Sequence, residues 1–397
     1  MNRVQHPVEN GRNGGPVSRS WWIYRGTGQP LPDIRLADVL PPPPGWRAFD
    51  GGPVLPPVPA ESAETDRRLG SAGRTTSRQD PHDIDMINTA LLLRRPLLVT
   101  GRPGIGKSTL AYLVARELGL GRVLHWGITS RSTLRSGLYE YDAIGRAQAS
   151  LGRGPAVAPD HDGTAAAARS GTTAARSDTT AAPVADGGTG APDGGTGAPA
   201  GGATAARIGD FVRLGPLGTA LLPYELPRVL LIDELDKSDI DLPSDLLHVL
   251  ENGSYDIPEL VRARHHESRA QVFTDDPDTT VTVTDGRVRC RAFPFVVITS
   301  NGERQFPPAF LRRCVRLDVS PPREDQLAAM IAAHFRDQEG RHDDMIRAFV
   351  ERSRQHGGLA TDQLLNAVFL RTAGVREDDE SWSELLDALW RELSGAP

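Results

Sequence analysis

Lysine is nearly absent from this chain of 397 residues. The 45 basic residues include only two lysines, Lys107 and Lys237, and the other 43 are arginines. Cysteine is just as scarce, because Cys290 and Cys314 are too few for a disulfide framework, which fits a reducing compartment. The chain also has no excess of basic over acidic residues, since its net charge is −6. The composition therefore gives no basis for binding nucleic acid or an anionic membrane through bulk charge.

Long apolar runs are absent too, since the apolar stretches are only a few residues long and are broken by arginine. The first residues, MNRVQHP, lack the apolar region of a signal peptide. We therefore expect a cytoplasmic protein that is neither secreted nor inserted in a membrane.

One of the two lysines lies in a glycine-rich segment, PLLVTGRPGIGKSTL, at residues 96–110. The segment predicts a buried strand at 97–100, a turn that matches G-x-x-x-x-G-K-[ST], and a helix that begins near Lys107. Glycines let backbone N–H groups surround a phosphate, the lysine reaches the β- and γ-phosphates, and the hydroxyl of Ser108 reaches Mg²⁺. A Gly/Pro turn before an ordinary helix is the alternative, but one of only two lysines stands in this loop. The candidate residues for binding ATP and Mg²⁺ are Gly101, Pro103, Gly104, Ile105, Gly106, Lys107, Ser108 and Thr109.

Acidic residues follow a second buried strand. The apolar run at 229–232 is typical of a parallel strand that is buried on both faces, and it ends at Asp233 and Glu234. Such a pair alone is more often a solvated helix cap, but the phosphate loop upstream favours a catalytic role. Asp233 is then the candidate metal ligand together with Ser108, and Glu234 is the candidate base for an attacking water.

Asn301 ends another apolar run, at 295–299. The Asn-Gly pair there could form a hairpin turn, but the next residues contain two prolines and do not alternate. We therefore expect Asn301 to position a water molecule or a phosphate.

The chain divides into three parts. Residues 1–79 are rich in proline and glycine but carry aromatic residues, so they form either an extended strap on the body or a disordered tail. Residues 80–320 form the α/β core, with a low-complexity insert at 150–206 that repeats DGGTGAP and is expected to be disordered. Residues 321–397 have helical periodicity, with spans near 323–336, 342–355, 359–373 and 380–394. Further predicted elements are helices at 80–95, 108–118 and 242–250, strands at 123–128 and 315–319, and a hairpin around Asp285-Gly286.

These motifs, with the run PPAFLRRC at 307–314 and the helical segment after it, resemble an AAA+ ATPase of the MoxR type over residues 80–395. The resemblance implies a P-loop core with a parallel sheet, a small all-α lid, and rings, usually hexamers, with ATP at the subunit interfaces. It also implies an arginine that reaches the neighbour's γ-phosphate. Arg313 occupies the matching position, but Arg312 replaces an acidic residue often seen there, so both are candidates. The usual lid arginine is not evident, because 359–366 reads LATDQLLN and Arg371 lies about two turns further on.

The function expected from this resemblance is ATP hydrolysis that remodels or activates a protein partner, such as one with a von Willebrand A-like domain. A nucleic-acid motor or nucleotidase is an alternative that needs a basic surface, which the net charge does not provide. A nucleotide-gated switch with little turnover is another, because the lid arginine is missing. Lys237 and the hairpin arginines Arg287, Arg289 and Arg291 either line a ring pore or form a solvated cationic face.

Overall fold

The computed structural model describes residues 19–31, 35–58, 63–71, 79–151, 207–335, 342–355, 358–374 and 380–390. The predicted insert lies outside these residues, except for its first two positions. Residues 143–207 form a unit of their own, in which helix α6 (Ala143–Leu151) is described. The rest of the described chain belongs to one compact unit.

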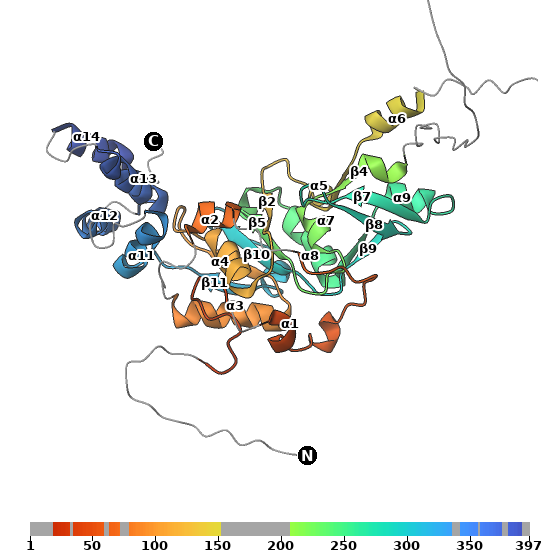
Figure 1. The fold of residues 1–397 in the computed structure, drawn as a ribbon, viewed down its shortest axis with the longest axis horizontal. Coiled ribbons are helices and arrows are strands. Elements are labelled where there is room, and N and C mark those ends of the chain that lie inside the picture. Colours follow the sequence, from red (N-terminus) through yellow and green to blue (C-terminus); the bar gives the residue numbers. More distant parts are fainter. Residues whose placement is uncertain are drawn as a thin grey trace, which may run out of the picture. The chain divides into compact units, whose positions relative to one another are not determined.

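A five-stranded parallel sheet forms the centre of the core (Figure 1). The inner strands are buried along almost their whole length, which explains why their sequences are apolar without alternation. The predicted α/β class with a parallel sheet is therefore confirmed, and all five predicted strands of this sheet are present. In their order across the sheet, the strands are β11 (Val315–Asp318), β1 (Leu97–Thr100), β10 (Phe295–Ser300), β5 (Val229–Asp233) and β2 (Leu124–Gly127).

The register of the sheet brings the ends of three strands together. Thr100 at the end of β1 pairs with Ser300 at the end of β10, and Ile298 of β10 pairs with Ile232 of β5. Because parallel strands end at the same edge, the segments that follow β1, β5 and β10 begin side by side. This edge is where the predicted phosphate loop and its partners lie.

Side chains of the parallel sheet alternate between two apolar clusters. On one face, Leu97 packs in a cluster with α3 (Pro81–Leu93) and α4 (Thr109–Leu118). On the other face, Leu98 packs in a cluster with α8 (Leu242–Asn252) and a second sheet. The sheet is therefore covered on both sides. The remaining short helices are α1 (Leu36–Val39), α2 (Ala63–Leu69), α5 (Leu134–Leu138), α7 (Pro216–Ala220), α9 (Pro258–Ala263) and α10 (Pro308–Leu311), with 3-10 turns η1 (Gly45–Arg47), η2 (Ile208–Phe211) and η3 (Leu235–Lys237).

The aromatic N-terminal segment packs on α3 and α4 over residues 19–31. Trp22 donates its indole N–H to Asp85 at 2.8 Å, and Tyr24 is fully buried. Asn88 accepts the backbone N–H of Tyr24 at 3.0 Å and donates to its carbonyl at 2.7 Å. Glu117, on the last turn of α4, accepts three backbone N–H groups from residues 25–28. The described part of this segment is thus bonded to the helix that follows the phosphate loop.

A second sheet has six strands, of which the sequence predicted only the hairpin. That prediction is confirmed, because Asp285 and Gly286 both have positive φ, 53° and 71°, as a tight two-residue turn requires. The strands, in order across the sheet, are β3 (Tyr139–Tyr141), β4 (Val212–Leu214), β7 (Arg269–Phe273), β8 (Thr280–Thr284), β9 (Arg287–Arg289) and β6 (Ser254–Asp256).

Helices follow the core to the end of the described chain and have their own apolar cluster. The four predicted helical spans are all present, with bounds that differ by a few residues. They are α11 (Glu324–His334), α12 (Asp343–Gln355), α13 (Thr361–Thr372) and α14 (Glu380–Leu389). Among the described residues, no helix has the length and apolar composition needed to cross a bilayer.

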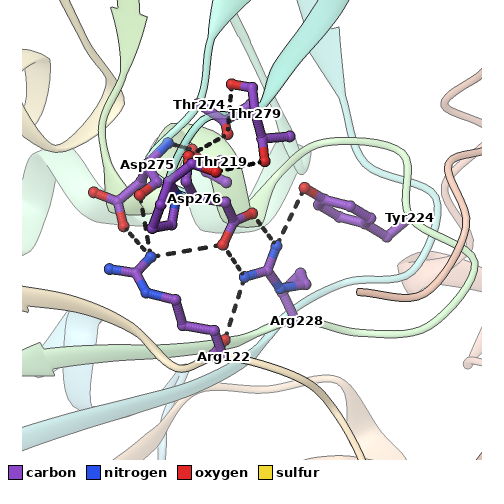
Figure 2. Close-up of polar contacts among 9 residues, drawn as sticks. Arg122, Thr219, Tyr224, Arg228, Thr274, Asp275, Asp276 and Thr279 are labelled. Carbon is purple, nitrogen blue, oxygen red and sulfur yellow. Dashed lines mark hydrogen bonds and ion pairs between the residues drawn. The ribbon is translucent and has the colours of Figure 1, made fainter. Parts of the chain in front are cut away.

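A buried ion pair ties the second sheet to the parallel sheet (Figure 2). Arg228, directly before β5, is 2% exposed, and an N–H group of each terminal nitrogen donates to a carboxylate oxygen of Asp276, at 2.7 and 2.8 Å. It also donates to the hydroxyl of Tyr224 at 3.2 Å. Arg122, before β2, pairs at 2.9 Å with Asp275 in the same loop after β7. This loop is thus fixed to the starts of two strands of the parallel sheet.

We expect Asp276→Ala to lower the free energy of unfolding by about 3–5 kcal/mol, because it leaves the guanidinium of Arg228 buried without its counter-charge. Asp275→Ala is the matched control. Its partner Arg122 is 28% exposed, so the loss is expected to stay near 1 kcal/mol or below. Urea unfolding measures both values. Equal small losses in the two variants would show that the buried pair contributes no more than the exposed one.

Candidate nucleotide-binding site

The phosphate loop connects β1 to α4 and is held open by glycines. Gly101, Gly104 and Gly106 have φ of 149°, 74° and 89°, which side chains rarely adopt. A Cβ on Gly101 would lie 2.8 Å from the carbonyl oxygen of Val319. The first turn of α4 follows directly, so its free N–H groups and its positive end face the same space. This is the geometry in which a helix N-terminus binds a phosphate.

Lys107 is almost buried at the centre of this loop, with 7% of its surface exposed. Its ammonium group donates to the carbonyls of Gly101 and Arg102, at 2.9 and 2.7 Å, and to the side-chain oxygen of Asn301 at 2.7 Å. Burial lowers the pKa of Lys107, while three carboxylates nearby oppose that shift. The loop and the end of β10 are thus joined through the predicted lysine and the predicted asparagine.

Asp233, at the end of β5, accepts two short hydrogen bonds. Its Oδ1 accepts from the hydroxyls of Ser108 and Thr299, each at 2.6 Å, and its Oδ2 lies 3.4 Å from Nε2 of His125. Burial alone would raise the pKa of Asp233, but these donors lower it to about 2. The carboxylate is therefore ionised at neutral pH. Together with the Ser108 hydroxyl it offers the oxygen ligands that Mg²⁺ prefers, so the residues fit the predicted metal.

Glu234 has a left-handed backbone, with φ 61° and ψ 49°. For a residue other than glycine this conformation costs about 1–3 kcal/mol and often marks a functional site. The Glu234 N–H donates to Thr299 at 2.8 Å, while its carboxylate contacts Lys237 at 2.7 Å and the side-chain N–H of Asn301 at 3.3 Å. Asn301 therefore connects Lys107 to Glu234. The polar residues predicted after three separate strands are brought together.

Three residues of this site were missed from the sequence: Asp236, Thr299 and His125. Asp236 is 5% exposed, and its Oδ2 accepts the N–H groups of Asn301 and Glu303, at 2.9 and 3.1 Å. It thereby fixes the backbone that carries Asn301. The sequence offered one signal for Asp236, because it is the last residue of the run DELD that begins at the end of β5. Thr299 and His125 lie on β10 and β2, the two strands that flank β5, so no local sequence pattern places either of them next to Asp233.

Arg312 and Arg313 lie at the opposite edge of the parallel sheet from the phosphate loop of the same chain. They precede β11, whose first residue pairs with the first residue of β1. Arg313 is 41% exposed and contacts Glu251 at 3.1 Å, while Arg312 is exposed and its carbonyl accepts from Arg95 at 3.2 Å. The structure therefore does not bring either arginine to the loop of its own chain.

A pocket of about 970 Å³ adjoins the phosphate loop on the side of the C-terminal helices. Arg102, Pro103 and Ile105 line it from the loop, and Leu359 and Phe349 line it from the helical segment. This volume lies within the range of about 300–1,000 Å³ that is typical of ligand pockets.

The helical segment is bonded directly to the phosphate loop. Thr361, the first residue of α13, donates its N–H and its hydroxyl to the carbonyl of Gly104, at 2.9 and 2.5 Å. Arg371 pairs instead with Asp344, at 3.1 Å, and does not line the pocket. The arginines that do line it from the helical side are Arg323 and Arg354, neither of which the sequence singled out.

No family model matches this chain, and no curated protein matches it. Among solved structures, the chain is similar to NtrX from Brucella abortus, crystallised in complex with ADP. The sequence identity is 14% and the TM-score 0.28, over 74% of this chain and 50% of that one. The chain thus spans about half the length of this neighbour, and a likeness at this level carries no argument about fold or function.

Proposed function

We propose that this protein binds ATP with Mg²⁺ and hydrolyses it, as a P-loop ATPase of the AAA+ class. The observation that carries the proposal is the convergence of a glycine loop, Lys107, Asp233 and Glu234 at one edge of a parallel sheet. Each of these groups has a chemical task in phosphoryl transfer to water.

The groups divide the reaction between them. Lys107 exchanges its present acceptors for oxygens of the β- and γ-phosphates and balances their charge. Ser108 and Asp233 would hold Mg²⁺, which would neutralise charge on the phosphates. Glu234 takes the proton of the attacking water, and Asn301 orients that water or the γ-phosphate beside it.

Assembly is part of the proposal, because the resemblance implies an arginine that reaches the γ-phosphate bound by a neighbouring subunit. Arg313, or Arg312 beside it, cannot reach the loop of its own chain, but it can reach the loop of a neighbour in a ring. The resemblance to MoxR-type proteins supports such a ring, usually a hexamer. It also supports a protein partner that is remodelled or activated, such as one with a von Willebrand A-like domain.

A nucleotide-gated switch with little turnover is the second candidate, and one contact favours it. The carboxylate of Glu234 is held by Lys237 at 2.7 Å, so the base is engaged before any water is bound. If that contact persists with ATP in place, the protein binds nucleotide but releases little phosphate.

Steady-state phosphate release with and without Mg²⁺ separates the two candidates, alongside a titration with a fluorescent ATP analogue. The ATPase predicts binding and continuous release that stops when Mg²⁺ is removed. Binding followed by less than one phosphate per chain would support the switch. Absence of nucleotide binding would reject both.

The arginines test assembly as well as chemistry. Arg313→Ala subunits keep their own loop and carboxylates but cannot stabilise charge at a neighbouring site, so they should bind ATP and be nearly inactive. Lys107→Ala subunits are inactive for the opposite reason and still present Arg313. Mixing the two variants should restore part of the phosphate release, at interfaces that combine an intact phosphate loop from one subunit with an intact Arg313 from the other.

Arg312→Ala, mixed in the same way, is the matched control that identifies which arginine acts. The mixtures are checked by sizing for co-assembly. No recovery in either mixture of co-assembled subunits would mean that each chain works alone.

A further inference from the structure

The hairpin of β8 and β9 splays apart beyond its turn. Thr284 pairs with Arg287, and within the described residues this is the one Cα pair that joins the two strands. A regular hairpin would continue by pairing Thr282 with Arg289. Instead, β9 pairs with β6 over its whole length and β8 pairs with β7 over its whole length. Beyond Thr284, this side of β8 is therefore paired with no other strand among the described residues.

Backbone hydrogen-bonding groups of β8 face this open side. At one end of the β7–β8 ladder, the N–H of Asp285 donates to the carbonyl of Ser268 at 2.7 Å. Bonded positions in an antiparallel ladder recur at every second residue, so Val283 and Val281 also direct their backbone groups toward β7. Thr282 lies between them and therefore directs its N–H and C=O toward the open side.

A groove of about 1,020 Å³ runs along this edge. Five consecutive residues of β8, 280–284, line one side, and β9 with the segment 50–53 lines the other. An extended chain rises about 3.3 Å per residue and lies about 4.8 Å from a paired strand. The β8 edge therefore has the length to pair with about five residues of an added strand.

The rim of the groove carries four arginines and three aspartates. Arg287 and Arg289 already pair with Asp256 and Asp50. Arg269 lines the groove too, and in the described part of the chain it makes no ion pair or hydrogen bond through its side chain. The outward side of an added strand would thus face cations, one of them without a counter-charge.

Apolar side chains line the inner wall of the groove. Val281, at 9% exposed, Leu222 and Leu55 all contribute to it. Because side chains of a strand alternate between its two faces, an added strand would place every second residue against this wall.

We propose that the open edge of β8 binds an extended acidic segment of a partner protein as an added β-strand. Main-chain bonds to Thr282 supply the pairing, acidic side chains face the arginine rim, and the alternate apolar side chains face Val281. This partner site uses no residue of the nucleotide site, so its test is independent of ATP hydrolysis.

The probe is a fluorescein-labelled hexapeptide that alternates aspartate and valine, and its binding to the full chain is measured by fluorescence anisotropy. A peptide that alternates lysine and valine is its charge control. We expect saturable binding of the acidic peptide that weakens with salt, and at least tenfold weaker binding of the basic one. Equal binding of the two peptides, or no binding of the acidic one below 1 mM, would overturn the proposal.

Thr282→Pro tests the pairing itself, because proline removes an N–H that faces the groove but none that β7 uses. We expect Kd to rise about tenfold or more. Thr282→Val keeps the N–H and should bind within about twofold of the wild type. Arg269→Gln should weaken the acidic peptide several-fold. Unchanged affinity in a folded Thr282→Pro variant contradicts an added strand.

A second arm covers the case in which Thr282→Pro does not fold. The same acidic peptide, N-methylated at its valines in one version and at its aspartates in another, is titrated against the wild-type protein. Only one set of N–H groups points at β8, so one version should lose at least tenfold in affinity and the other should not. Equal affinities would refute strand pairing. A change in oligomer mass in Thr282→Pro without peptide binding would assign the edge to a second copy of this chain instead.

Discussion

Lys107→Ala is expected to weaken ATP binding by a factor of about 10²–10⁴. The lysine makes charge-assisted contacts with two phosphates, and each such bond contributes about 1.5–3 kcal/mol. No second lysine can replace it, because the chain has only one other, Lys237. Titration of the purified variant with a fluorescent ATP analogue measures the loss.

Lys237→Ala is the matched control, since it removes the chain's other lysine from the same neighbourhood. Lys237 is 44% exposed and contacts Glu234, not the phosphate loop, so ATP affinity should change by less than about threefold. Melting curves without nucleotide show whether each variant is folded. Undiminished affinity in Lys107→Ala would contradict the phosphate-loop assignment, and an equal loss in both variants would point to a general change of charge.

The parallel sheet could be predicted because its inner strands have sequences that only burial on both faces explains. The run at 229–232 is apolar without alternation, and the structure buries it on both faces. The second sheet could not be predicted in the same way. Strands such as β3 and β4 have only three residues, too few to show a period of two. Only its hairpin was visible, because Asp285-Gly286 is a turn signal that does not depend on strand length.

The sequence predicted the residues of the site that stand in a local motif. It missed the residues that only the arrangement of the strands and helices brings to the site. Lys107, Asp233 and Glu234 stand in recognisable local patterns. Asp236 acts by holding the backbone of a segment that lies 65 residues away, which no local pattern shows. The cations of the pocket were missed for a similar reason. Arg354 lies in the last turn of α12, and its place in the pocket depends on how the helices pack.

The contacts of the Glu234 carboxylate decide whether the protein is an active ATPase or a switch. Glu234→Gln tests the role of this carboxylate directly. We expect the variant to bind ATP within about threefold of the wild type, because the glutamine amide can still contact Asn301. Phosphate release should fall by about 10²–10⁴, since an amide cannot take the proton of the attacking water. Single-turnover phosphate release and the ATP titration are measured on the same preparation.

Glu303→Gln is the matched control, because it removes one exposed carboxylate at the end of the same sheet without touching Lys107 or Glu234. It should leave turnover within about twofold of the wild type.

A third variant, Lys237→Ala, frees the Glu234 carboxylate from its 2.7 Å contact with Lys237. If that contact limits the wild type, this variant releases phosphate faster, and the added rate disappears when Glu234→Gln is combined with it. Wild-type turnover in Glu234→Gln would instead assign the base to another residue. Equal turnover in the wild type and Lys237→Ala would show that ATP binding alone releases the carboxylate.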